Sequence, residues 1–280
     1  MGGSALGGNA ETKLIAQRVL QDLSAGDLVW AAYETRLESG EIITHSHEFA
    51  FVYVLTGSLL FNQGLPSRTL EPIQGEAVTA NIAHRHGAID GESIFWEILL
   101  TAQGSGPPPD SGNSRLVFES AMLLDIPGAP LATFVLVFVP PGGQTSVHTH
   151  PGPELIYQLS GRIDYENALI GVRSMGVGDV EGIPPDTAVQ KRNPFDEGAA
   201  FLSWFLVDTA LPFATAARFE SPDAGGDNLA LAANGASVVA VSSNFGRGNL
   251  ESAYGANNAL DGDPSTEWSS DGDGDSAWIE

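Results

Sequence analysis

The sequence contains no cysteine, so disulfide bonds, thiolate metal sites and a cysteine nucleophile are excluded together. It also lacks any uninterrupted apolar run near the length of about 18 residues that a membrane-spanning helix needs. Residues 1–10 have neither the basic start nor the apolar stretch of a signal peptide. We therefore expect no membrane insertion, and we interpret residues 1–12 as a flexible leader.

Basic residues are scarce. The chain has 12 lysines and arginines against 35 aspartates and glutamates, which gives a formal net charge of −23. A surface of that charge repels both a phosphate backbone and anionic lipid. Nucleic acid and membrane surfaces are therefore not expected as partners.

Helical periodicity is almost absent, since residues 12–23 are the one segment that shows it. The 33 glycines and 17 prolines separate many short segments rich in β-branched and aromatic residues. At 280 residues, with 42% hydrophobic residues, the chain is long enough for two domains with packed cores. The composition predicts an all-β protein with one short N-terminal helix.

An internal repeat divides the chain at an offset of about a hundred residues. Residues 51–57 (FVYVLTG) correspond to residues 155–161 (LIYQLSG), and each copy ends in a Trp-x4-Thr-Ala segment that begins at Trp96 or Trp204. We expect both tryptophans to be core residues. The repeat predicts two homologous domains.

All six histidines lie in His-x-His pairs, at positions 45 and 47, 84 and 86, and 148 and 150. On a strand, residues i and i+2 point to the same face, so two imidazoles can converge on one point. That is the geometry a metal ion needs. The pairs therefore predict metal sites formed by His45, His47, His84, His86, His148 and His150.

The second copy resembles the cupin family, whose first motif is G-x5-H-x-H-x3-E-x6-G. Every position of that motif is met, by Gly142, His148, His150, Glu154 and Gly161. The resemblance implies a small jelly-roll barrel in which His148, His150 and Glu154 bind one metal ion.

The second cupin motif is only partly present, because Val189, followed by Gln190, stands where the family has its last histidine. Two histidines and a carboxylate can still hold iron, manganese, nickel or zinc. In the first copy the family's glutamate falls on Ala50, and either His84 or His86 completes a site with His45 and His47. Glu48 lies nearby, but out of register with the motif.

The C-terminal residues resemble the opening of a discoidin-type, galactose-binding-like domain, through residues 254–270 (YGANNALDGDPSTEWSS) and 277–280 (AWIE). The resemblance implies a calcium loop at Asp261, Asp263 and Thr266. Only about the first third of such a domain is present, so we expect this segment to be poorly ordered. If the resemblance is genuine, a glycan partner and export follow from it, and otherwise we expect a cytoplasmic protein.

The predicted architecture is two tandem cupin jelly-roll barrels followed by an incomplete C-terminal β segment. The predicted boundaries are 13–102 for barrel one, 103–114 for a linker, 115–218 for barrel two, 219–235 for a second linker and 236–280 for the partial discoidin-type domain.

Two hypotheses about function stay open. The first is an enzyme with one divalent transition metal (zinc, iron, manganese or nickel) per functional barrel, in which Tyr53, Tyr157 or Gln190 orients a small organic or sugar-derived substrate. The second is a non-catalytic bicupin that binds a small ligand or serves as a structural module. In either case the two homologous barrels of one chain can pack like a cupin dimer, and the chain itself can form a homodimer.

Overall fold

The computed structural model describes residues 8–21, 23, 27–64, 66–108, 113–219, 230–263 and 265–280. Part of the predicted leader and parts of both predicted linkers lie outside these residues. The chain divides into two compact units, residues 1–219 and 220–280, which we describe separately. In the described part of the chain, no helix is long and apolar enough to cross a membrane.

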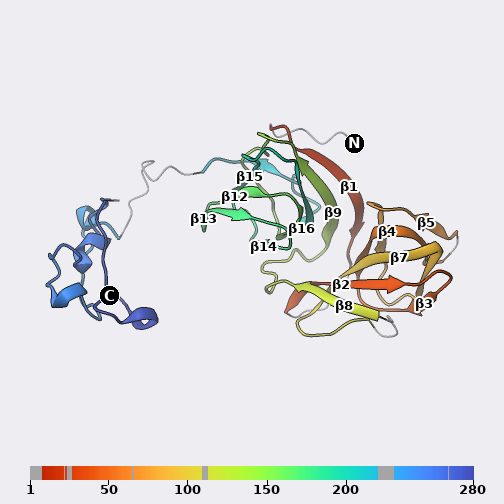
Figure 1. The fold of residues 1–280 in the computed structure, drawn as a ribbon, viewed down its shortest axis with the longest axis horizontal. Coiled ribbons are helices and arrows are strands. Elements are labelled where there is room, and N and C mark those ends of the chain that lie inside the picture. Colours follow the sequence, from red (N-terminus) through yellow and green to blue (C-terminus); the bar gives the residue numbers. More distant parts are fainter. Residues whose placement is uncertain are drawn as a thin grey trace. The chain divides into compact units, whose positions relative to one another are not determined.

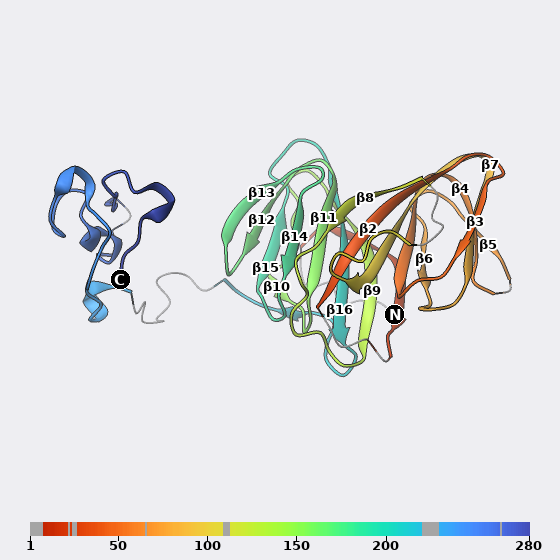
Figure 2. The ribbon, with the colours of Figure 1, turned by 90° about the horizontal axis from the view of Figure 1, so that it is seen from below.

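The first barrel, shown in Figures 1 and 2, is built from β2 to β8. Its strands pair in the order β5-β4-β7-β2-β8, with β3 paired to β7 and β6 paired to β4. The bounds are β2 Leu28–Leu37, β3 Ile42–His45, β4 Ala50–Asn62, β5 Arg68–Leu70, β6 Gly75–Val78, β7 His84–Ala102 and β8 Asn113–Glu119.

The second barrel is a sandwich of two sheets, ordered β1-β9-β16-β11-β14 and β13-β12-β15-β10-β17. The bounds are β1 Glu11–Val19, β9 Pro130–Val139, β10 His148–Thr149, β11 Glu154–Ser160, β12 Ile163–Asn167, β13 Gly171–Met175, β14 Val180–Ile183, β15 Val189–Arg192, β16 Ala199–Asp208 and β17 Thr215–Ala216. These antiparallel sheets confirm the all-β jelly-roll prediction.

The predicted N-terminal helix is wrong, because Glu11–Val19 forms strand β1. This strand pairs with β9 in the second barrel, from Glu11 opposite Phe138 to Val19 opposite Leu131 (Figure 1). The weak helical periodicity of this segment does not decide its conformation, because its backbone pairs with the backbone of β9 instead. The first strand of the chain therefore belongs to the second barrel's sheet.

The two barrels share a hydrophobic core, which lies between the seven-stranded sheet of the first barrel and the β1-β9-β16-β11-β14 sheet of the second. Phe51 stacks near Trp30 at 5.9 Å and contacts Phe134 at 5.4 Å between ring centroids. Trp204 stacks on Phe134 at 5.2 Å, and Trp96 also lies in this core, as expected. Such aromatic pairs contribute about 0.5 to 1.5 kcal/mol each beyond the area they bury. The shared core holds the barrels together.

The interior of each barrel is formed by the alternate residues of the same strands. In the first barrel Val52 and Val54 point inward, whereas Phe51 and Tyr53 point to the shared core. Inward positions on β7 therefore include Phe95 and Leu99, with Glu97 between them. This alternation decides which side chains can reach a site inside the barrel.

Residues 230–280, apart from Pro264, form turns and four short 3-10 helices, η1 Ala232–Asn234, η2 Phe245–Arg247, η3 Ala256–Ala259 and η4 Gly274–Ser276. One isolated bridge, between Val241 and Ile279, represents the expected β segment. Backbone hydrogen bonds close this unit, including Val239 N–H to Glu280 C=O at 2.7 Å. The described residues are thus folded, in contrast to the poorly ordered segment that we expected.

Candidate metal centre

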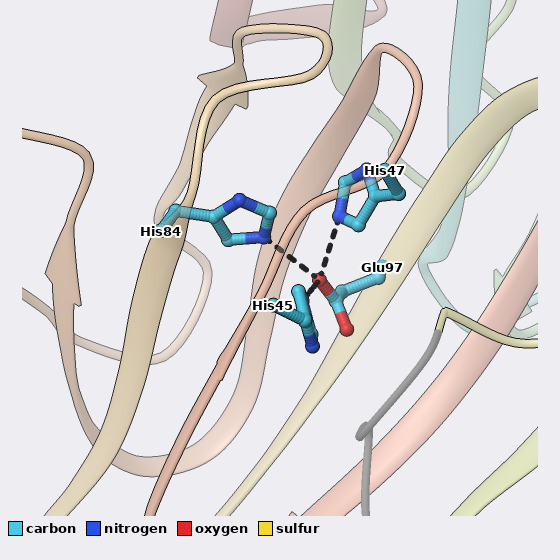
Figure 3. Close-up of side chains that lie close together, drawn as sticks. All are labelled: His45, His47, His84 and Glu97. Atoms are coloured by element: carbon cyan, nitrogen blue, oxygen red, sulfur yellow. Dashed lines mark hydrogen bonds and ion pairs between the residues drawn. The ribbon is translucent and has the colours of Figure 1, made fainter.

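Four imidazoles converge on one carboxylate inside the first barrel (Figure 3 draws three of them). The Nε2 atoms of His45, His47 and His86 lie 2.9, 3.1 and 3.1 Å from Oε1 of Glu97. The Nε2 atom of His84 lies 3.6 Å from the same oxygen. Ligand atoms of His45, His47, His84 and Glu97 all lie within 4.8 Å of one another, so these four residues could hold a metal ion.

Strand pairing explains why the histidines meet. His45, the last residue of β3, is directly opposite His84, the first residue of β7. His86 follows two residues later on the same face of β7, opposite Ile43. The sequence predicted that these pairs would point inward, and the structure places all four imidazoles together.

Glu97 is the residue that the sequence analysis missed. It lies on β7, opposite Val52 of β4, and is completely buried. In the second barrel the position that matches Val52 is Ile156, whose partner on β16 is Ser203. In the second barrel the carboxylate, Glu154, is on β11 at the position that matches Ala50. In the first barrel it is on the neighbouring strand β7, at the position that matches Ser203. Its position between the inward residues Phe95 and Leu99 was the signal that could have identified Glu97 as a site residue.

The same pairing shows that the two tryptophans of the repeat are not equivalent. Trp96 is opposite Tyr53, whereas Trp204 is opposite Leu155. Since Leu155 matches Phe51, the Trp-x4-Thr-Ala segments are offset by two residues. Because of that offset, the sequence repeat alone does not show that Glu97 corresponds to Ser203.

Hydrogen bonds fix the ring nitrogens that face the site. The Nδ1–H groups of His47 and His84 are placed to donate to the carbonyl oxygens of Glu48 and Ile82. A neutral imidazole that donates from Nδ1 has a lone pair on Nε2. The Nε2 atoms of His47 and His84 therefore both face Oε1 of Glu97, where either a proton on each ring or one metal ion among them compensates the carboxylate.

Electrostatics keeps this carboxylate ionised. Burial alone would raise the pKa of Glu97, but the charge of His86 and hydrogen bonds from His45, His47 and His84 lower that pKa well below its ordinary range. Burial lowers the pKa of His86, against the opposing effect of Glu97. A buried anion surrounded by nitrogen ligands is thus available to a metal ion at neutral pH.

The second barrel brings together His148, His150 and Glu154, as the cupin motif implied, but it adds Lys191. The Nζ atom of Lys191 lies 3.1 and 3.2 Å from the two oxygens of Glu154. Ser203 donates its hydroxyl to Oε1 of Glu154 at 2.6 Å. Nε2 of His150 lies 3.9 Å from Oε2 of the same carboxylate.

Both histidines of the second barrel use Nδ1 to donate to backbone carbonyls. His148 donates to Ser146 at 2.8 Å and His150 to Phe213 at 2.7 Å. Burial lowers the pKa of His150 to about 4 and also lowers that of His148. Burial would raise the pKa of Glu154, yet the charge of Lys191 lowers it overall. The site therefore contains neutral imidazoles beside an internal ion pair.

Three predicted substrate residues lie away from these centres. Tyr53 and Tyr157 point into the core between the barrels, where their rings contact Phe134 at 5.4 Å and Trp96 at 5.0 Å. Burial raises the pKa of Tyr53 to about 12. Gln190 faces away from Lys191 and donates to the Thr145 carbonyl at 2.9 Å. The expected role in orienting a substrate does not agree with these positions, because alternation on each strand turns them outward.

The predicted calcium loop is a chain of local hydrogen bonds. Thr266 donates its hydroxyl to Asp261 at 2.8 Å, and Ser265 donates to Asp263 at 2.6 Å. Hydrogen bonds from Ser265 lower the pKa of Asp263. These contacts stabilise a turn and leave the calcium site a prediction.

Taken with the sheet order and the inward histidines, the fold is that of a cupin. Residues 135–205 match the family model described as a cupin domain. No curated protein sequence matches the chain.

Solved structures of oxalate decarboxylases have a similar fold. One, from Bacillus subtilis and studied for its Mn(II) centres, has 16% sequence identity and a TM-score of 0.51, over 75% of this chain and 75% of that chain. A formate complex of the Lactobacillus farciminis enzyme has 15% identity and a TM-score of 0.52, over 74% and 86%. At these identities the likeness shows the fold alone.

Proposed function

We propose that the first barrel binds one divalent transition metal ion through His45, His47, His84 and Glu97, and that the chain is a metal-dependent enzyme for a small organic substrate. The observation that carries the proposal is the convergence of His45, His47, His84 and a buried Glu97, whose ligand atoms lie within 4.8 Å of one another while backbone carbonyls hold Nδ1 of His47 and His84. Backbone carbonyls that accept a hydrogen bond from the other ring nitrogen are typical of metal-binding histidines.

Nitrogen and carboxylate ligands suit manganese, iron, nickel or zinc. The Mn(II) centres of the similar Bacillus subtilis enzyme make manganese the first metal to test. A divalent ion bound there would act as a Lewis acid on a substrate oxygen. Because Glu97 is the single carboxylate of the set, the loaded site would carry a net positive charge, which favours a small organic acid.

The chain's own residues would position the ion and keep water away. His86, whose Nε2 lies 3.1 Å from Glu97, can donate to that carboxylate and orient it. The inward residues Val52, Val54 and Phe95 make the surroundings apolar. An apolar lining strengthens the electrostatic interactions of a bound ion and substrate.

Metal content is the direct test of this proposal. We expect about one metal ion per chain in the purified protein, and the double variant His45→Ala/His47→Ala should lose it. The matched control His148→Ala/His150→Ala should keep it. A wild-type protein that binds no metal even after reloading, or a first-barrel variant that keeps its metal, would refute the proposal.

A structural metal site in a non-catalytic bicupin is the second candidate. It is favoured by burial, because none of His45, His47, His84 and Glu97 is more than 9% exposed. Electron paramagnetic resonance of the Mn(II)-loaded protein separates the two functions. A spectrum that changes when oxalate or formate is added indicates an open ligand position and an enzyme, whereas an unchanged spectrum indicates a structural ion.

We further propose that residues 236–280 begin a discoidin-type domain and that residues 13–102 and 115–218 each contain one repeat. The compact unit around Val241 and Ile279 supports the first part. Calcium binding at Asp261, Asp263 and Thr266, a glycan partner and export depend on that resemblance. A calcium titration of the whole chain, with Asp261→Asn as the control, tests the calcium site.

A further inference from the structure

The second barrel has all the groups of a two-histidine, one-carboxylate metal site, but its carboxylate is already bound. Lys191 contacts both oxygens of Glu154, and Ser203 donates to one of them. The Lys191 side chain is 1% exposed and that of Glu154 is 2% exposed. This is therefore a buried ion pair with an additional hydrogen bond, and not a surface contact.

Strand register places Lys191 where the first barrel has a metal-site histidine. His45 is opposite His84 in the first barrel, and His148 is opposite Val189 in the second. Two residues further along the strand, His86 therefore corresponds to Lys191. The second barrel has thus lost both of its late histidines and gained an ammonium group in one of their places.

The two barrels also differ in charge. In the first, the Nε2 atoms of His47 and His84 face Glu97, and no lysine or arginine pairs with that carboxylate in the described structure. In the second, His148 and His150 have the same tautomer, with Nδ1 bonded to a carbonyl, but the ammonium of Lys191 neutralises Glu154. A metal ion would have to displace a buried ammonium, which would repel it.

We propose that the Nζ ammonium of Lys191 takes the place of a metal ion in the second barrel, so that His148, His150 and Glu154 bind no metal while Lys191 is present. The family's metal therefore does not fit this barrel as it stands. The three ligands form a latent site, and a substitution that removes the ammonium opens it.

The test is the difference in metal content between the wild type and Lys191→Met, each measured on the whole chain after loading with Mn(II) or Zn(II) and removal of excess metal. We expect Lys191→Met to gain about one metal ion per chain, and Lys191→Arg, which keeps the positive charge, to gain none. Adding His148→Ala/His150→Ala to Lys191→Met should abolish the gain. Because the readout is a difference, it is independent of whether the first barrel binds metal.

A wild type whose metal is lost in His148→Ala/His150→Ala would overturn the inference, as would a folded Lys191→Met variant that gains none. If Lys191→Met does not fold, crystals of the wild type grown with Mn(II) decide through anomalous scattering. A peak among His148, His150 and Glu154 overturns the inference. A second barrel without a peak, beside Lys191 still paired with Glu154, supports it.

Discussion

The two barrels compensate the negative charge of a buried carboxylate in different ways. Each buries a carboxylate beside two imidazoles that donate from Nδ1 to backbone carbonyls. The first barrel surrounds Glu97 with four histidines, whereas the second pairs Glu154 with Lys191. A buried anion needs a cation nearby, and the cation can be an external ion or a side chain. Two barrels of the same fold therefore do not imply two metal sites.

The largest effect is expected from breaking the internal ion pair of the second barrel. Glu154→Gln leaves the buried ammonium of Lys191 unpaired and should lower the free energy of unfolding by about 3 to 5 kcal/mol. Denaturant unfolding of the metal-free chain measures it. The double variant Glu154→Gln/Lys191→Met should recover most of the loss, and a single variant as stable as the wild type would contradict the pairing.

In the first barrel, the matching substitution should affect metal binding more than it affects the metal-free fold. Glu97→Gln removes the anionic ligand and should weaken metal affinity about 100-fold or more, because losing a ligand costs at least as much as losing a group that only orients one. A competition titration with a chelator measures it. Glu97→Asp, which keeps the charge, should bind metal more tightly than Glu97→Gln, and equal affinities would show that the carboxylate is not a ligand.

The two histidines of β7 differ in whether a backbone carbonyl holds their Nδ1 atom. His84 has its Nδ1 fixed by a carbonyl and His86 does not, so we expect His84→Ala to weaken metal binding about tenfold more than His86→Ala. His86→Ala should itself cost about 10-fold, because it removes a donor to Glu97. The same competition titration ranks them, and the reverse order would make His86 the ligand.

The smallest effect is expected from mild acid on the second barrel. The charge of Lys191 and the other polar contacts hold the pKa of Glu154 below its ordinary value of 4.5. A carboxylate whose pKa is lowered by folding contributes stability above its unfolded pKa and loses it as the pH falls through the folded pKa. The stability difference between the wild type and Glu154→Gln in chelator should therefore stay constant from about pH 7 to 5.5 and shrink only below the unfolded pKa. A difference that already shrinks above pH 5.5 would mean that the pair is not ionised as described.

Much of the fold could be predicted from local patterns. The repeat of residues 51–57 at 155–161, the His-x-His pairs and the glycine-rich turns specify antiparallel barrels, because alternation and turn chemistry act over a few residues. The helix predicted for residues 12–23 failed for the opposite reason. Its strand conformation depends on β9, more than a hundred residues away along the chain.

The sequence by itself therefore determined the fold class and the inward direction of the histidines. Only the tertiary structure decided that Glu97 joins the histidines of the first barrel and that Lys191 pairs with Glu154 in the second. Glu97 is 52 residues from His45, and Lys191 is 37 residues from Glu154, so each contact depends on how strands distant along the chain pair and pack. The physical reason is that a one-residue change of register turns a side chain to the other face, and no local pattern fixes the register of distant strands.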